Sequence, residues 1–270
     1  MLSVVAEAST WSPIDLQEAV SGDYTGPQPA LLQRSDGKHL MYPGMVHSLA
    51  GPPGGGKSWI AQEAAGQMLR SGSNVLYFDF EDFPESVVSR LKILGVPDQT
   101  ILERFGYVSP SEPLPPDGAE GLDGWIEVVD LVVLDGVTDA MTLHQWNPID
   151  NRDSAEFMQR LIRPLASGVR RPAVLLVDHV TKASDNRGRY AIGAQHKLAA
   201  VQVQFTVETT TPFDQDHDGT ITMSVTKDRY GQVQRLTSMG GSKEVARFHF
   251  KHLVPGNEAM TVYIDPPAGS

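Results

Sequence analysis

From residue 45 onward, short apolar runs alternate with longer segments in which apolar residues recur at helical spacing. Four of the runs predict strands: residues 45–50, 74–80, 130–135 and 173–178. A helix is predicted over residues 59–69, and another from the spacing of Met158, Leu161, Ile162 and Leu165. Strands that alternate with helices predict an α/β fold with a mostly parallel central sheet flanked by helices.

The last third of the chain has a different pattern, in which β segments follow one another without helices. We expect antiparallel strands at the sheet edge over residues 201–207, 220–226 and 233–236, and one or two more within 245–264. A short strand is predicted at residues 105–108. Loops are predicted at residues 109–124, 136–152 and 181–197.

Two acidic residues are expected to cap helices. Asp82 and Glu85 have the spacing of a capping box, with Asp in place of Ser or Thr. Asp153, with Glu156 three residues on, is expected to cap the later helix. Residues 1–42 show little periodicity and predict an extended lead-in with a short helix near residues 14–20. We therefore divide the chain into a lead-in, residues 1–42, and a main domain, residues 43–270.

Composition restricts the classes of protein to consider. The chain has 270 residues, 40% of them hydrophobic, and no cysteine, which excludes disulfides and thiolate metal sites. No signal peptide is visible in residues 1–11, and no apolar run is long enough to span a membrane. We expect a protein of the cytoplasm of a bacterial or phage-infected cell. The net charge of −11 argues against a globally basic nucleic-acid binder but leaves a local basic channel possible.

The strongest motif is the P-loop pattern G-x-x-x-x-G-K-[ST] between the first strand and the first long helix. Its glycines permit the tight turn that aims backbone N–H groups at a phosphate. Lys57 is expected to reach the β- and γ-phosphates of ATP, and the Ser58 hydroxyl to hold Mg²⁺. The predicted ATP-binding residues are Gly51, Pro52, Pro53, Gly54, Gly55, Gly56, Lys57, Ser58 and Trp59.

Acidic residues at two other strand ends fit the chemistry of ATP hydrolysis. Asp135 ends an apolar strand and is expected to hold Mg²⁺ together with Ser58, the Walker-B role. Glu81 follows the second strand and is our candidate for the base that activates water. Asp79 and Asp82 compete for that role, because spacing alone does not separate the three carboxylates.

Two further groups have both a structural and a functional interpretation. His179, at the end of the fourth strand, is either an ordinary polar strand end or a sensor of the γ-phosphate. Lys227 and Arg229 are either the charged end of a hairpin or a cation pair offered to a neighbouring subunit, with Arg229 as an arginine finger. Residues 214–219 begin like a calcium loop, but Val225 stands at the twelfth position, so a hairpin turn is the better interpretation.

The order of these parts resembles the RecA-like P-loop ATPases of the RepA/DnaB hexameric-helicase branch, found in phages and plasmids. The resemblance covers about residues 43–250. It is based on the P-loop, Glu81-Asp82, the strand ending at Asp135, the His179 motif with Lys182, and the late Lys227-x-Arg229. It implies a RecA-like fold, Glu81 as base, His179 as sensor, and Lys227 and Arg229 acting across a subunit interface.

The same resemblance implies a homo-oligomer, either a filament or a ring. For a ring, six copies are expected. It also implies that loops 136–152 and 181–197 contact single-stranded DNA, with Lys182, Arg187, Arg189 and Lys197 as the candidates, in replication or recombination with its partner proteins. We expect ATP hydrolysis coupled to translocation along single-stranded DNA or to its unwinding, although the chain leaves no room for the N-terminal collar of DnaB-type enzymes. The alternatives are an ATP-switched recombination mediator or helicase loader, and a KaiC-like regulatory ATPase.

Overall fold

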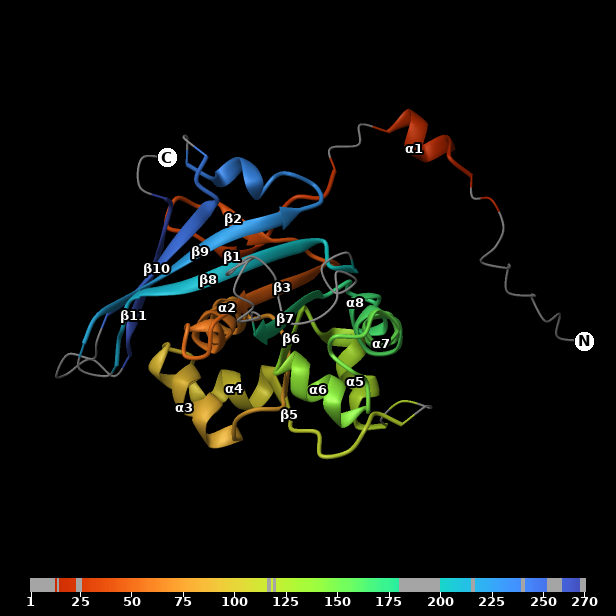
Figure 1. Ribbon diagram of the computed structural model, residues 1–270, viewed down its shortest axis with the longest axis horizontal. Helices are drawn as coiled ribbons and strands as arrows, with labels where there is room; N and C mark the ends of the chain where they lie inside the picture. The colour runs from red at the N-terminus through yellow and green to blue at the C-terminus, as the bar shows by residue number, and fades with distance from the viewer. Residues whose placement is uncertain are drawn as a thin grey trace, which may run out of the picture.

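The computed structural model describes residues 13, 15–22, 26–115, 118, 120–179, 200–214, 217–238, 241–251 and 259–267. A nine-stranded sheet runs through the molecule in the order β11-β10-β9-β8-β3-β7-β6-β4-β5 (Figure 1). Its parallel strands are β3 (Val46–Gly51), β4 (Val75–Asp79), β5 (Phe105–Val108), β6 (Leu131–Asp135), β7 (Ala173–His179) and β8 (Val203–Thr211).

The C-terminal edge of the sheet is antiparallel. It consists of β9 (Gly219–Asp228), β10 (Glu244–Lys251) and β11 (Thr261–Asp265), which continue from β8. The prediction of a mostly parallel sheet with an antiparallel C-terminal edge is therefore confirmed, as are the four main strands and the short strand at 105–108.

Helices cover both faces of the parallel part (Figure 1). One layer holds α2 (Lys57–Arg70), α3 (Pro84–Ile93) and α4 (Asp98–Arg104); the other holds α5 (Asp123–Val128), α6 (Val137–Leu143), α7 (Asn151–Phe157) and α8 (Arg163–Ala166). Strand alternation separates the two cores, since Leu131 and Val133 of β6 face the first layer and Val132 and Leu134 the second. Almost continuously apolar strands are thus explained by burial on both sides.

A small hairpin precedes the main sheet and was not predicted. It pairs β1 (Leu31–Gln33) with β2 (His39–Met41), and Leu40, Met41 and Tyr42 are fully buried in the same core as α2. The predicted short helix is present as α1 (Gln17–Ser21). The domain limit at residue 42 stays a prediction.

Three local predictions were wrong. Residues 136–152 are not one long loop: Val137, Ala140 and Met141 are buried at helical spacing and form α6. The cap of α7 is Asp150, whose carboxylate accepts the N–H groups of Arg152 and Asp153, so Asp153 lies inside the first turn. The segment 233–236 is a 3-10 turn, Gln234–Leu236, because the Asp228 carboxylate accepts the N–H groups of Val233 and Gln234.

The helix predicted from the spacing of Met158, Leu161, Ile162 and Leu165 is confirmed, and these four residues are buried. Residues 158–162 within it are π-helical.

The capping box expected at Asp82 also differs from the structure. The N-cap of α3 is Phe83, and the Asp82 carboxylate instead accepts hydrogen bonds from Phe83 N and Ser86 Oγ. None of the helices among the described residues combines the length and the apolar character needed to cross a bilayer.

Candidate nucleotide site

The carboxyl ends of four adjacent parallel strands meet at one edge of the sheet. In register, Gly51 of β3 pairs with His179 of β7, and Asp135 at the end of β6 pairs with Asp79 at the end of β4. The P-loop follows β3 at this edge. Ligands of open α/β sheets bind in the crevice outside the carboxyl ends of the strands. The fold therefore brings the P-loop, Glu81, Asp135 and His179 to one place.

The P-loop backbone requires glycine for two reasons. Gly54 and Gly56 have φ of 69° and 79°, in the left-handed region that other residues rarely adopt. A Cβ on Gly56 would also collide with the side chain of Ile221, and one on Gly51 would lie 2.8 Å from the carbonyl oxygen of Val207. Strands β8 and β9 thus pack directly against the loop and hold its shape.

Lys57 begins α2 and lies inside the loop. The residue is only 7% exposed, and Nζ donates to the carbonyl oxygens of Gly51 (3.2 Å) and Pro52 (3.0 Å). Burial lowers the pKa of Lys57, while the carboxylates of Glu81, Asp135 and Asp178 oppose that shift. The ammonium is thus the positive centre of an otherwise acidic strand edge, which is where a phosphate chain needs it.

Asp135 fits a role in cation binding. The residue is only 4% exposed, and its Oδ2 accepts a 2.7 Å hydrogen bond from Tyr77 Oη, while Oδ1 is buried without a hydrogen-bond partner among the described residues. Burial raises the pKa of Asp135 to about 6, although the hydroxyl groups of Tyr77 and Ser58 oppose the shift. The buried carboxylate oxygen that accepts no hydrogen bond, together with the nearby Ser58 hydroxyl, forms a pair of oxygen ligands that suits Mg²⁺.

The described residues hold no group of three or more His, Asp or Glu side chains placed to hold a metal ion by themselves. Mg²⁺ commonly takes one or two protein ligands and completes its shell with water and substrate phosphates. The residues at Ser58 and Asp135 match that mode of binding. Calcium at residues 214–219 gains no support, because Gly219 begins β9 of the β8–β9 hairpin.

The three carboxylates after β4 have different surroundings. Asp79 is 1% exposed and accepts hydrogen bonds from Glu81 N, Asp82 N and Tyr107 Oη, so its oxygens hold the turn together. Asp82 holds the start of α3 and forms an ion pair with Arg90 at 3.3 Å. Glu81 alone of the three contacts the strand-end histidine, and its side chain is 37% exposed.

His179 connects Lys57 to Glu81. Its Nδ1 lies 3.3 Å from Lys57 Nζ, and its Nε2 lies 3.2 Å from Glu81 Oε1. Because an ammonium only donates, Nδ1 accepts from Lys57 and the ring proton is on Nε2, which donates to Glu81. The backbone N–H of His179 donates to Asp178 Oδ1, which also accepts from Thr138 of α6. Hydrogen bonds through Asp178 thus join the backbone of His179 to α6.

Gly136 is a site residue that sequence reasoning missed. It follows Asp135 with φ of 93°, and a Cβ there would lie 3.0 Å from Glu81 Cγ and from Phe80 Cβ. Glycine at this position leaves the space that the Glu81 side chain uses. A glycine directly after the acidic end of a buried strand was the available signal.

Lys227 and Arg229 lie far from the P-loop of their own chain. Asp228, between them, pairs with Val203 at the start of β8, and Val203 in turn pairs with His47 near the start of β3. The pair is therefore at the opposite end of the sheet from Gly51. Lys227 Nζ donates to Val201 O at 2.7 Å, whereas Arg229 is exposed.

Trp59 and the four basic DNA candidates are the remaining predicted site residues. Trp59 packs edge-on against Phe213 and Phe250, with the Arg90 guanidinium 5.6 Å from its ring centre. The DNA candidates Lys182, Arg187, Arg189 and Lys197 lie outside the described residues.

Residues 12–185 match the family model of the AAA domain, which is more than half of the chain. The chain belongs to the AAA domain family. AAA domains are P-loop ATPase domains that bind nucleotide, usually with a divalent metal, and the matched residues include the P-loop, Glu81, Asp135 and His179. No curated protein matches the sequence.

Proposed function

We propose that the chain is a Mg²⁺-dependent ATPase of the RepA/DnaB type. Its nucleotide site is completed by a second copy, and its turnover is coupled to single-stranded DNA. The observation that carries the proposal is the contact of Lys57, His179 and Glu81 beside the P-loop, with Lys227 and Arg229 at the opposite end of the same sheet. A head-to-tail contact between copies would bring the two ends together.

Each residue has a defined part in the proposed reaction. The P-loop amides and Lys57 bind and orient the β- and γ-phosphates. Ser58 and Asp135 would hold Mg²⁺, which would neutralise phosphate charge. Glu81 takes a proton from the attacking water while the water oxygen bonds to the γ-phosphorus. The bond between the γ-phosphorus and the oxygen that leaves with ADP breaks. Arg229 of the neighbour stabilises charge on the transferred group.

His179 is the proposed link between nucleotide state and the rest of the chain. It contacts the lysine expected at the γ-phosphate and the carboxylate expected at the water, and β7 ends at it. A γ-phosphate that attracts Lys57 would weaken the hydrogen bond to Nδ1. The segment after His179 carries the basic residues that we propose to contact DNA.

The DNA part is tested by steady-state ATP turnover with and without single-stranded DNA, at low and at moderate salt. Strong, salt-sensitive stimulation is expected, because binding to phosphates releases counter-ions. Weak turnover together with DNA-dependent assembly would indicate the mediator or loader. Turnover and assembly that are both indifferent to DNA would indicate the regulatory ATPase, for which the net charge of −11 is natural.

A further inference from the structure

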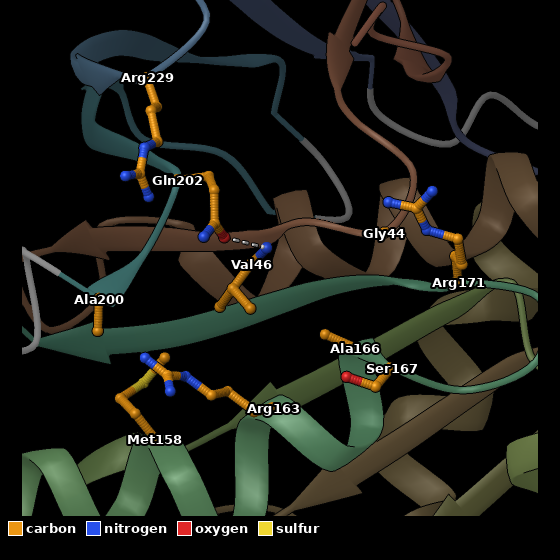
Figure 2. Close-up of a pocket in the computed structure, with 10 residues that line it drawn as sticks. All are labelled: Gly44, Val46, Met158, Arg163, Ala166, Ser167, Arg171, Ala200, Gln202 and Arg229. Atoms are coloured by element: carbon orange, nitrogen blue, oxygen red, sulfur yellow. Dashed lines mark hydrogen bonds between the residues drawn. The ribbon is translucent and has the colours of Figure 1, made fainter. Parts of the chain in front are cut away.

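A pocket of about 510 Å³ opens at the end of the sheet opposite the P-loop (Figure 2). Its wall is formed by Gly44 and Val46 around the start of β3, by Met158 and α8, by Arg171 before β7, by the segment before β8 and by Arg229 after β9. Gln202 fixes one side, since its Oε1 accepts a 2.9 Å hydrogen bond from Val46 N. The pocket volume lies within the range of small-ligand sites, roughly 300–1,000 Å³.

Three arginines line this pocket: Arg163 of α8, Arg171 before β7 and Arg229 after β9. Among the residues that the structure describes, no aspartate or glutamate lines it. Within the described part of the chain, none of the three guanidinium groups makes a hydrogen bond, an ion pair or a ring contact. The adjacent Arg170, which does not line the pocket, pairs with Asp130 at 2.7 Å.

This arrangement is unusual for an acidic chain. The sequence has 33 acidic and 22 basic residues, so carboxylates are available to pair with surface arginines. Three cations in one concave surface repel one another, and an anion within the pocket relieves that repulsion. The positions of Arg163, Arg171 and Arg229 therefore favour a ligand with several negative charges.

The pocket and the P-loop lie at the two ends of one strand. Val46 begins β3 and Gly51 ends it, a separation of about 17 Å at the usual rise of a strand. The P-loop end carries Glu81, Asp135 and Asp178, whereas the pocket end carries the unpaired arginines. The pocket arginines and the carboxylates beside the P-loop have opposite charges, which suits head-to-tail association.

We propose that Arg163, Arg171 and Arg229 form a second phosphate-binding site, which takes the polyphosphate of a nucleotide. The planar guanidinium fork matches phosphate oxygens, and three such groups offset most of the charge of a triphosphate. The nucleotide is either free in solution or bound to the P-loop of a second copy. The identification of a nucleotide as the phosphate source rests on the proposed function; the affinity of the pocket for phosphate does not.

Inorganic tripolyphosphate is the probe, titrated calorimetrically without Mg²⁺ at low salt into full-length Lys57→Ala, whose P-loop is disabled. Binding to this variant is expected to persist. Adding Arg163→Gln and Arg171→Gln should weaken it by about tenfold or more, because each removes a charge-assisted contact. Arg152→Gln with Arg235→Gln removes the same charge from arginines outside the pocket and should leave binding largely unchanged.

Absence of tripolyphosphate binding to Lys57→Ala would overturn the proposal, and so would an equal loss in the control. Circular dichroism checks that each variant is folded. Sedimentation with ATP, in chains that keep Lys57, then separates the two sources. If ATP drives assembly and the Arg163→Gln, Arg171→Gln double variant does not assemble, the pocket takes the phosphates of a nucleotide bound to a second copy. If nucleotide binds to the pocket without assembly, the ligand is free nucleotide. Absent ATP turnover with intact tripolyphosphate binding would refute the proposed function and leave this site standing.

Discussion

Replacing Gly136 by alanine tests whether the space beside Asp135 positions Glu81. The new Cβ would lie 3.0 Å from Glu81 Cγ and 3.0 Å from Phe80 Cβ, on a backbone with φ of 93°. The flexible Glu81 side chain gives way more easily than the Phe80 Cβ, so the candidate base is expected to move. Displacements of about 1 Å at a reacting group cost on the order of 100-fold in rate. We expect the Glu81 side chain to move by less than that, so turnover should fall by about 10- to 100-fold.

Gly72→Ala is the matched control. Gly72 has a similar φ of 83°, but a Cβ there has no atom within 4 Å. Left-handed backbone costs alanine about 1–2 kcal/mol, so both variants should lose at least that much free energy of unfolding. Gly136→Ala should lose about 1–3 kcal/mol more from crowding.

The assay compares steady-state ATP turnover, nucleotide affinity and denaturant midpoints for the two variants. Only Gly136→Ala should lose turnover, and its nucleotide affinity should stay close to that of the original chain, because the P-loop is unchanged. Equal turnover in both variants would refute the positioning of Glu81 by Gly136.

Three more predictions concern single residues of the proposed mechanism. Lys57→Ala should abolish ATP binding or turnover, and normal turnover would contradict the P-loop assignment. Arg229→Ala should keep nucleotide affinity, measured by calorimetry, and lose about 10³-fold or more in turnover if the guanidinium acts as a finger; retained turnover would assign Arg229 a structural role. Because the folded-state pKa of Asp135 is raised to about 6, protonation stabilises the metal-free fold, and this stability is lost as pH rises through 6. Asp135→Asn should therefore raise the free energy of unfolding without metal at pH 8 by about 3 kcal/mol, a gain that shrinks towards pH 4; a gain independent of pH would contradict the burial of a charged carboxylate.

Local sequence pattern was sufficient for the parts of the site that lie next to one another in the chain. The P-loop between β3 and α2, and Asp135 at the end of an apolar run, follow from short-range signals. The parallel order of the strands then places their ends together without knowledge of any contact. For this reason the fold class and the main strands could be predicted.

The other features depend on contacts between distant segments. Asp79 and Glu81 differ because Tyr107 and two backbone N–H groups occupy Asp79, which no local pattern reveals. The hairpin β1–β2 is short and gains its stability from the core around α2. The presence of Arg163, Arg171 and Arg229 in one pocket likewise requires the register of β3, β7 and β8.

The central claim is that two copies build one ATPase site, and mixing two inactive variants tests it most directly. Glu81→Gln lacks the base and Arg229→Ala lacks the finger, so each alone should be inactive. In an equal mixture with random head-to-tail assembly, about a quarter of the interfaces would combine an intact Glu81 with an intact Arg229. The account predicts recovery of about that share of the original turnover. A mixture as inactive as its two components would contradict a site shared between copies.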